Sequence, residues 1–159
     1  MDNINYAIRY LVLNYPYKDE LSKTRLTKMV YLADWKSAQK HHTQITNIKW
    51  RFYHFGPFVN DVFKAAQKDS KLLVLDDFSM YGTVKKVISI KGKQNEASLR
   101  LDKLTLRECS ILDDIINETK YLNWSEFIDY VYDTYPIKTQ RRYGILDLIS
   151  LAGEEKYNR

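Results

Sequence analysis

The sequence has 159 residues, of which 45% are hydrophobic and 28% charged, close to the average of an ordered globular domain. We expect one domain over residues 1–159, because five glycines and three prolines leave little room for a flexible linker. The net charge of +5 favours a polyanionic or acidic partner, although a solvated basic surface explains the same excess.

Two amphipathic helices are predicted at the start of the chain. Apolar residues at helical spacing predict the first helix over Asn3 to Asn14, before Pro16. Either Ser22 or Thr24 can cap the second helix. Its apolar stripe comprises Leu26, Met29, Val30 and Ala33. Its outer side is expected to carry the basic residues Lys23, Arg25, Lys28 and Lys36.

The next part of the chain changes from an extended to a helical pattern. Residues Gln44 to Phe55 are rich in β-branched and aromatic side chains, which favours an irregular or short extended segment. The pair Gly56 and Pro57 then breaks this pattern. A third helix is predicted beyond it from apolar residues at helical spacing, Val59, Val62, Phe63 and Ala66.

Three short strands are predicted after the third helix, over residues 72–75, 84–91 and 97–101. The last two strands show alternating apolar residues and are joined by the turn-rich Gly92 to Asn95. We therefore expect a small antiparallel sheet that contains a basic hairpin.

The C-terminal third of the chain is predicted to be helical. Thr105 and Glu108 have the spacing of a capping box, and Asn123 can open a further helix that ends near Pro136. The final helix is expected to carry Ile145, Leu148, Ile149 and Ala152 before Gly153. Together these elements predict an α+β fold, mostly helical, with a small antiparallel β-sheet.

The sequence predicts a cytoplasmic protein. The N-terminus lacks the apolar core of a signal peptide, and no apolar stretch is long enough to span a bilayer. The single cysteine, Cys109, cannot form an internal disulfide, which fits a reducing compartment. Because Cys109 lies within a capped amphipathic helix, we interpret it as a core residue.

No segment carries a catalytic or metal-binding motif. A glycine-rich phosphate loop, a GxSxG elbow and an HExxH helix are all missing. The histidines His41, His42 and His54 lack the spacing of metal ligands. We therefore expect no enzyme, no cofactor and no metal site. A hydrolase built on Asp34, Asp61 and His54 stays open as an alternative, because the sequence does not show whether these side chains meet.

Basic residues gather in three places, over residues 18–40, 85–103 and 138–142. A basic helix together with a basic hairpin is the outline of a winged-helix reader, so a regulator that binds nucleic acid is an alternative function. Acidic residues interleave with many of these positions, so a solvated surface explains much of the charge.

Two segments carry more specific information about the protein than its overall composition does. The first reads LTKMVYLADW from Leu26 to Trp35, and the second reads WRFYHFGPFVND from Trp50 to Asp61. With Ile45-Thr46 between them, they resemble the Panacea domain of the SocA-like antitoxin family. In that family a helix of the type K-L-L-Y-L-A-D precedes an aromatic-Gly-Pro turn.

The resemblance covers nearly the whole chain, from the second predicted helix to about Ala152. Thr134-Tyr135-Pro136 and residues 145–148 are similar to the C-terminal end of the same domain. One departure is the loop over residues 40–44, which lacks the glycine that the family pattern has there.

The resemblance implies an antitoxin that neutralises a cognate toxin by direct protein contact. At least one branch of the family is similar to a protease adaptor, which implies an ATP-dependent protease as a further partner. Neither role needs catalysis by this domain or contact with a membrane. The residues that we expect to bind the partner are Tyr31, Asp34, Trp35, Tyr53, His54, Phe55, Gly56, Pro57 and Phe58.

The aromatic Gly-Pro segment has a physical interpretation of its own. Gly56 permits a backbone geometry that a side chain would obstruct, and Pro57 fixes the chain that enters the third helix. Exposed rings on such a stiff turn would form an anchor for a protein interface. Buried rings would make the same motif only a fold signature, and the sequence does not separate the two cases.

Overall fold

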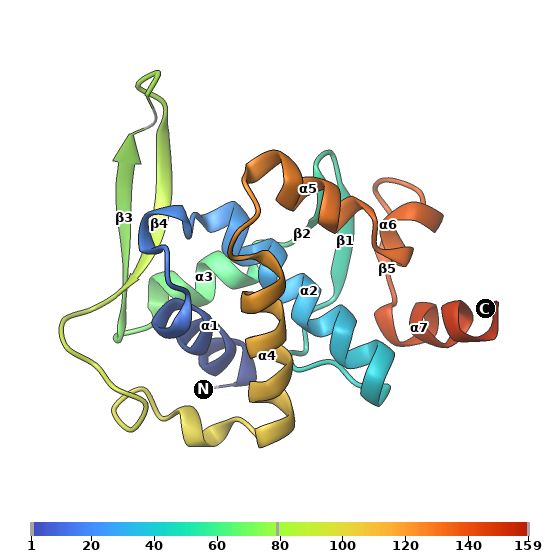
Figure 1. The fold of residues 1–159 in the computed structure, drawn as a ribbon, viewed down its shortest axis with the longest axis horizontal. Coiled ribbons are helices and arrows are strands. Elements are labelled where there is room, and N and C mark those ends of the chain that lie inside the picture. The colour runs from blue at the N-terminus through green and yellow to red at the C-terminus, as the bar shows by residue number, and fades with distance from the viewer. Residues whose placement is uncertain (1, 79, 159) are drawn as a thin grey trace.

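The computed structural model describes residues 2–78 and 80–158, and it confirms the predicted fold, mostly helical with small antiparallel sheets (Figure 1). Within these residues the helices are α1 (Asn3–Asn14), α2 (Lys23–His41), α3 (Asp61–Lys68), α4 (Leu106–Thr119), α5 (Trp124–Tyr132), α6 (Tyr135–Thr139) and α7 (Leu148–Tyr157). The strands are β1 (Trp50–Tyr53), β2 (Gly56–Phe58), β3 (Leu72–Phe78), β4 (Val84–Ile90) and β5 (Ile145–Leu146). Short 3-10 turns occupy η1 (Lys18–Glu20) and η2 (Leu101–Lys103).

Helix α2 runs through the middle of the molecule and packs against α1, α4 and α7 (Figure 1). Ser22 caps its start, since the hydroxyl oxygen accepts from the amide of Arg25 at 3.1 Å. At its end His42 adopts a left-handed backbone with φ of 56°, the conformation that glycine usually supplies. The chain therefore leaves α2 without the glycine of the family pattern.

The basic residues of α2 do not all face solvent as predicted. Arg25 and Lys28 are almost completely buried, because other elements cover α2 on most sides. The guanidinium of Arg25 lies 4.4 Å from the ring centre of Phe127. It also donates to the backbone oxygens of Thr119 and Leu122 at 2.9 and 3.1 Å. The prediction that these two cations lie on the outer side of the helix is thus wrong. Both are buried and donate to backbone oxygens of neighbouring elements.

A three-stranded antiparallel sheet joins two distant parts of the chain. Its strand order is β2-β1-β5, with Phe52 of β1 opposite Pro57 of β2. Buried and exposed side chains alternate along β1, so Trp50 and Phe52 face the core while Arg51 and Tyr53 face outward. The predicted extended segment is confirmed, and β5 ties it to the C-terminal region.

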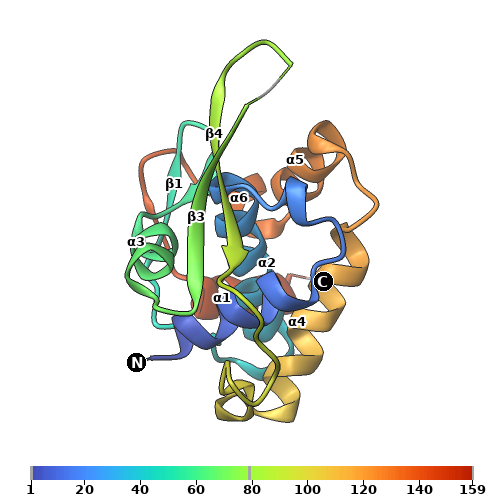
Figure 2. The same ribbon diagram turned by 90° about the vertical axis from the view of Figure 1, so that its left-hand side faces the viewer.

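The long hairpin differs from the predicted one. Strands β3 and β4 pair from Leu72 opposite Ile90 to Phe78 opposite Val84, and the hairpin projects from the helical body (Figure 2). Residues 97–101, which were expected to pair with residues 84–91, form a turn that leads into η2. The physical reason is that both edges of β4 are occupied. Strand β3 extends beyond its predicted end and pairs with β4 along its whole length, and Leu21 and Ser22 contact its other edge at Ile88 and Val87.

The predicted starts of two C-terminal helices are confirmed. Thr105 and Glu108 form a capping box at α4, in which each side chain accepts from the other residue's backbone amide at 3.1 and 2.9 Å. Asn123 and Glu126 form a second capping box at α5. These starts were predictable because the interactions that make them lie within four consecutive residues.

The predicted bounds of the C-terminal helices differ from those in the structure. Pro136 lies within the separate short helix α6 rather than at the end of α5. Ile145 belongs to β5, so the final helix begins at Leu148, and it continues through Gly153 to Tyr157. The late start of the final helix is explained by the pairing of Ile145 with Arg51 of the distant strand β1, because this strand contact takes the place of the first helical turn.

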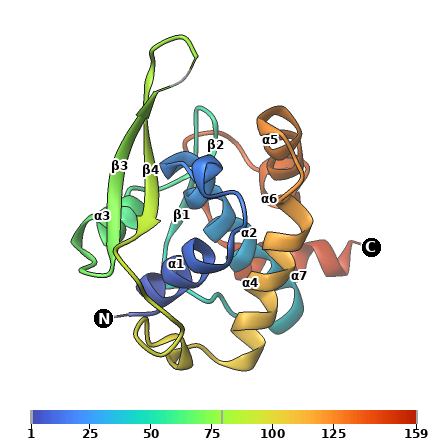
Figure 3. The ribbon, with the colours of Figure 1, turned by 60° about the vertical axis from the view of Figure 1, so that its left-hand side comes forward.

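The core is one cluster of buried hydrophobic residues that extends from Ile4 to Ala152. Helices α1, α2 and α4 pack side by side around it (Figure 3). Among the residues that the structure describes, no helix combines the length and the apolar character needed to cross a membrane.

Candidate partner-binding site

The predicted aromatic Gly-Pro segment forms the tight turn between β1 and β2. Tyr53 pairs with Gly56 in the antiparallel register, which leaves His54 and Phe55 at the tip. The φ of Gly56 is +97°, a conformation that residues with a side chain strongly disfavour. The expectation that Gly56 supplies a special backbone geometry is therefore confirmed.

The side chains of this turn divide into exposed and buried groups. Phe55 exposes 78% and Tyr53 exposes 41% of its surface, His54 is exposed and Phe58 is half-buried. The rings of Tyr53 and Phe58 meet edge to face at 6.2 Å, and His54 Nδ1 shares a 2.9 Å hydrogen bond with the hydroxyl of Tyr143. Tyr53, His54, Phe55 and Phe58 together form a turn surface that a partner can reach.

The other five residues expected to bind a partner lie inside the protein. Tyr31, Asp34 and Trp35 are buried in α2, and Gly56 and Pro57 are buried in β2. In the structure of the protein alone, these five residues are therefore covered by other parts of the chain. The apolar and aromatic residues of α2 serve the core, because nearly every face of this helix is covered.

Asp34 is the centre of a buried hydrogen-bond network. Its Oδ1 accepts from the amides of Ile45 and Thr46 at 2.9 and 3.0 Å. Its Oδ2 accepts from the Thr46 hydroxyl at 2.5 Å, from the Trp50 indole N–H at 2.9 Å and from the side-chain amide of Gln44 at 3.3 Å. Burial raises the pKa of Asp34 to about 6, although these donors act in the opposite direction. Through these hydrogen bonds, Asp34 attaches the loop that leads into β1 to helix α2.

The three side chains of the alternative hydrolase site, Asp34, Asp61 and His54, do not come together. His54 and Asp61 line one groove, but Asp34 lies in the core with both carboxylate oxygens bound by the donors just described. His41 is the last residue of α2 and His42 forms its C-cap, so these two histidines lie at the end of one helix. The part of the chain that the structure describes holds no group of three or more His, Cys, Asp and Glu side chains able to bind a metal ion.

A buried lysine supports the turn surface from beneath. Lys28 Nζ donates to the backbone oxygens of Phe55 at 2.7 Å and of Pro57 at 3.1 Å. Desolvation lowers the pKa of Lys28 to about 8, because burial penalises its charged form. Sequence reasoning missed this role, since the two oxygens that bind Lys28 lie nearly thirty residues further along the chain.

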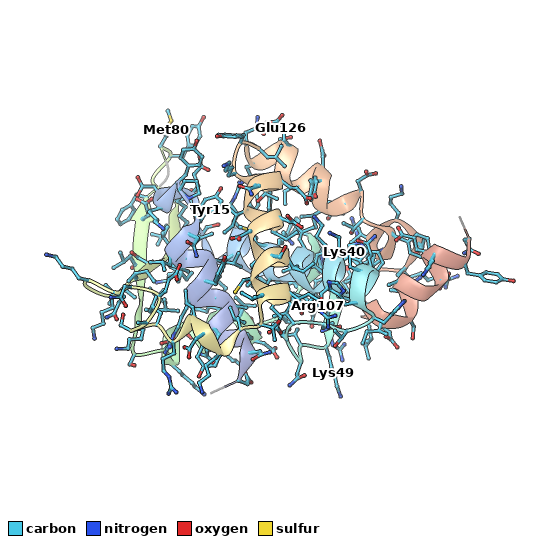
Figure 4. All side chains as sticks on the ribbon, turned by 60° about the horizontal axis from the view of Figure 1, so that its bottom comes forward. Tyr15, Lys40, Lys49, Met80, Arg107 and Glu126 are labelled. Atoms are coloured by element: carbon cyan, nitrogen blue, oxygen red, sulfur yellow. The ribbon has the colours of Figure 1, made fainter. Side chains whose placement is uncertain are left out.

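A groove of about 550 Å³ lies beside the turn surface. Arg51 and Tyr53 reach it from the outward face of β1, and Lys49 reaches it from the position just before this strand. Asp61 and Lys64 reach it from α3. Figure 4 shows Lys49 pointing away from the body of the protein. The spacing of Lys49, Arg51 and Tyr53 is the period-two pattern of an exposed strand face, so this signal was available in the sequence.

A second hollow of about 290 Å³, with an apolar lining, lies between the turn and α5. Phe55 lines it together with Trp124, Ile128 and Tyr132, and Lys28 contributes to both hollows. Trp124 exposes 48% of its surface. Figure 2 shows β1 and α3 on one side of the molecule and α5 on the other. Phe55 therefore stands between a cationic groove and an apolar hollow.

The positive φ of Gly56 makes this residue a sensitive point of the site. Gly56→Ala is expected to destabilise the protein by about 1–2 kcal/mol, because alanine avoids the left-handed region. The new Cβ would meet Lys28 Nζ at 3.5 Å and Tyr132 at 3.7 Å, which are ordinary contacts, so the cost comes from the backbone. Urea unfolding measures the effect. Gly153→Ala, within α7, is the control and is expected to stabilise by about 0.5–1 kcal/mol. Equal effects of the two substitutions would contradict the prediction.

The chain belongs to the SocA-like antitoxin family, because residues 26–136 match the model of the Panacea domain that is described as antitoxin SocA-like. The resemblance predicted from the two motifs is therefore confirmed. The match ends at residue 136, so it does not include the segment over residues 145–152 that was also expected to belong to the pattern. No curated protein and no solved structure matches the chain. Membership of this family gives the protein a role in a toxin–antitoxin system.

Proposed function

We propose that this protein neutralises its cognate toxin by direct binding, with Phe55 at the centre of the contact. The observation that carries the proposal is the 78% exposure of Phe55 at the tip of a turn whose backbone is bound from inside by Lys28. A large ring on a rigid backbone loses little conformational entropy when it binds, and such residues dominate protein interfaces.

The apolar hollow beside Phe55 supports the same surface. Phe55 and Trp124 flank a space of about 290 Å³, which is large enough to receive an apolar side chain of the toxin. Ile128 and Tyr132 form further parts of its wall. Covering these groups would remove apolar surface from water, which is the main favourable contribution to protein association.

Co-expression with the product of the neighbouring gene tests the proposal. The wild-type protein is expected to restore growth and to co-purify with the toxin. Phe55→Ala is expected to weaken the complex by about 30-fold or more and to abolish rescue, because it removes the central ring. Leu106→Ala is the matched control, since Leu106 exposes 90% of its surface at the start of α4, away from the turn.

Two outcomes would count against this proposal in different ways. A neighbouring product that is not toxic, or a wild-type protein that fails to rescue growth, would reject the antitoxin function itself. Rescue and binding that are equal for Phe55→Ala and Leu106→Ala would place the contact elsewhere on the protein. Isothermal titration of the purified variants separates weak binding from poor expression.

Presentation of the bound toxin to an ATP-dependent protease is a further part of the proposal. Its support is the resemblance to a family with a protease-adaptor branch. The half-life of the toxin in cells decides this point: an adaptor shortens it only when the protease is present. A half-life that is independent of the protease would leave neutralisation by binding alone.

The charges on the long hairpin argue against the nucleic-acid alternative. The β3–β4 register sets Asp76 opposite Lys86 and Asp77 opposite Lys85, and both pairs form ion pairs. Neutralised lysines release few counterions from a phosphate backbone, so they contribute little to nucleic-acid affinity. We therefore favour a protein partner.

A further inference from the structure

The groove beside the turn carries positive charge that the protein itself does not compensate. Lys28, Lys49, Arg51 and Lys64 line it, and among the described lining residues Asp61 alone supplies a carboxylate. None of these four cations forms an ion pair with another described residue. The groove therefore gathers into one hollow four cations that lack a counterion from the protein.

Lysines elsewhere on the protein show the contrast. Lys36 pairs with Glu118 where α2 meets α4, and Lys86 pairs with Asp76 on the hairpin. Cations and carboxylates are thus arranged as pairs on two other faces. The four cations of the groove lack such partners and lie beside the exposed rings of the turn surface.

We propose that the groove binds an acidic segment of the toxin, in which an aspartate or glutamate lies beside an aromatic or aliphatic side chain. This inference rests on the antitoxin function proposed above and names the chemistry of the partner at that site. Arg51 and Lys64 would pair with carboxylates near the rim, while Tyr53 and Phe58 would pack against the neighbouring apolar group.

Lys28 gives the groove an internal binding position. Its ammonium has three N–H donors, and the backbone oxygens of Phe55 and Pro57 accept two of them. A carboxylate that entered the groove could accept the third. Attraction between opposite charges is stronger in a partly dehydrated site than in water, so this contact would favour a carboxylate over a neutral group.

The shape of the site favours a peptide over nucleic acid. A volume of about 550 Å³ accommodates a few side chains, and its inner cation, Lys28, exposes only 1% of its surface. A carboxylate on a flexible side chain can reach such a cation. The phosphates of nucleic acid are held in a bulky backbone that cannot reach Lys28, so they would contact only the exposed cations at the rim.

Charge reversal at the rim of the groove tests the inference. The variant is Arg51→Glu with Lys64→Glu, and the control is Lys93→Glu with Lys103→Glu, two exposed lysines without ion pairs that change the net charge equally. The probes are the toxin, a short peptide of alternating glutamate and phenylalanine, and a single-stranded oligonucleotide. Binding is measured by titration and mapped by NMR, and circular dichroism confirms that both variants are folded.

We expect the groove variant to bind the toxin and the peptide about tenfold or more weakly than the control does. Peptide-induced NMR shifts are expected to be concentrated at Arg51, Tyr53 and Phe58. Equal binding by the two variants would overturn the inference while leaving the antitoxin function intact. An oligonucleotide that binds the groove more tightly than the peptide would also overturn it.

The two proposals can fail separately. If the wild-type protein binds no toxin but binds the peptide, and only the groove variant loses that binding, the groove retains its preference for acidic segments while the antitoxin function fails. If the wild-type protein binds the toxin and both double variants bind it equally well, the function stands and the groove is not its acidic docking site.

Discussion

Replacing Asp34 with alanine is expected to lower the free energy of unfolding by about 4 kcal/mol. The substitution leaves the donors of Gln44, Ile45, Thr46 and Trp50 without their common acceptor inside the core. Urea unfolding at neutral pH measures the loss. Asp102→Ala, at an exposed carboxylate, is the control and is expected to change stability by less than about 0.5 kcal/mol.

Asparagine at position 34 separates the acceptor role from the charge. The Thr46 hydroxyl can turn to accept from the new amide group, whereas the Trp50 indole N–H can only donate. We therefore expect Asp34→Asn to cost about 2 kcal/mol, less than the alanine variant. Equal stability of Asp34→Asn, Asp34→Ala and the wild-type protein would show that the network contributes little.

The difference in stability between the wild-type protein and Asp34→Asn is expected to depend on pH. The pKa of Asp34 is about 6 in the folded protein and 3.8 as the ordinary value, so the folded state binds the proton more tightly. Its contribution to stability is therefore fully present at low pH and is lost as the pH rises through 6. The difference in stability between wild type and Asp34→Asn should increase by about 1 kcal/mol from pH 7 to pH 5. A difference that shrinks on acidification would mean that the hydrogen bonds outweigh burial.

Features of the fold that depend on neighbouring residues were predictable. The start of α4 follows from Thr105 and Glu108, and the range of α1 follows from its apolar spacing and Pro16. The turn at Gly56 follows from the freedom of glycine to adopt a positive φ. In each case the residues that make the interaction lie within a few positions of one another.

Features that depend on distant residues were not predictable. Lys28 looks like a surface lysine in a helical pattern, yet the carbonyl oxygens near residue 56 and the cover around α2 place it inside. Strand β5 is only two residues long, and only its pairing with β1 reveals it. The register of β3 with β4 depends on the length of β3, which its mixed pattern did not show.

The candidate site combines both kinds of information. An aromatic turn around Phe55 was expected from the motif, because Gly56 permits a special backbone geometry and Pro57 restricts the chain after it. Its neighbour Trp124 comes from α5, nearly seventy residues further along the chain, and only tertiary packing brings the two to one hollow. Exposure also required the structure, since Phe55 and Trp35 are equally aromatic in the sequence but lie outside and inside, respectively.

Replacing Asp69 with alanine is expected to destabilise the protein by about 3–5 kcal/mol, because it leaves Arg9 as an unpaired charge in the interior. The two side chains form a buried bidentate pair, with Arg9 Nε and Nη2 at 2.9 and 2.8 Å from the carboxylate oxygens. Thermal unfolding measures the loss. A loss of less than about 1 kcal/mol would show that Arg9 reaches solvent or another acceptor when Asp69 is removed.

The double variant Arg9→Met with Asp69→Ala distinguishes the cost of an orphaned charge from the value of the pair. Since removing both charges also removes their desolvation penalty, we expect the double variant to be more stable than Asp69→Ala alone. Asp69 is the C-cap of α3, so the pair ties the end of this helix to α1. Helix α3 carries Lys64 into the cationic groove, and the double variant should therefore regain stability without fully regaining affinity for the acidic peptide. A double variant that recovers both equally would mean that packing alone positions α3, and that the ion pair contributes only to stability.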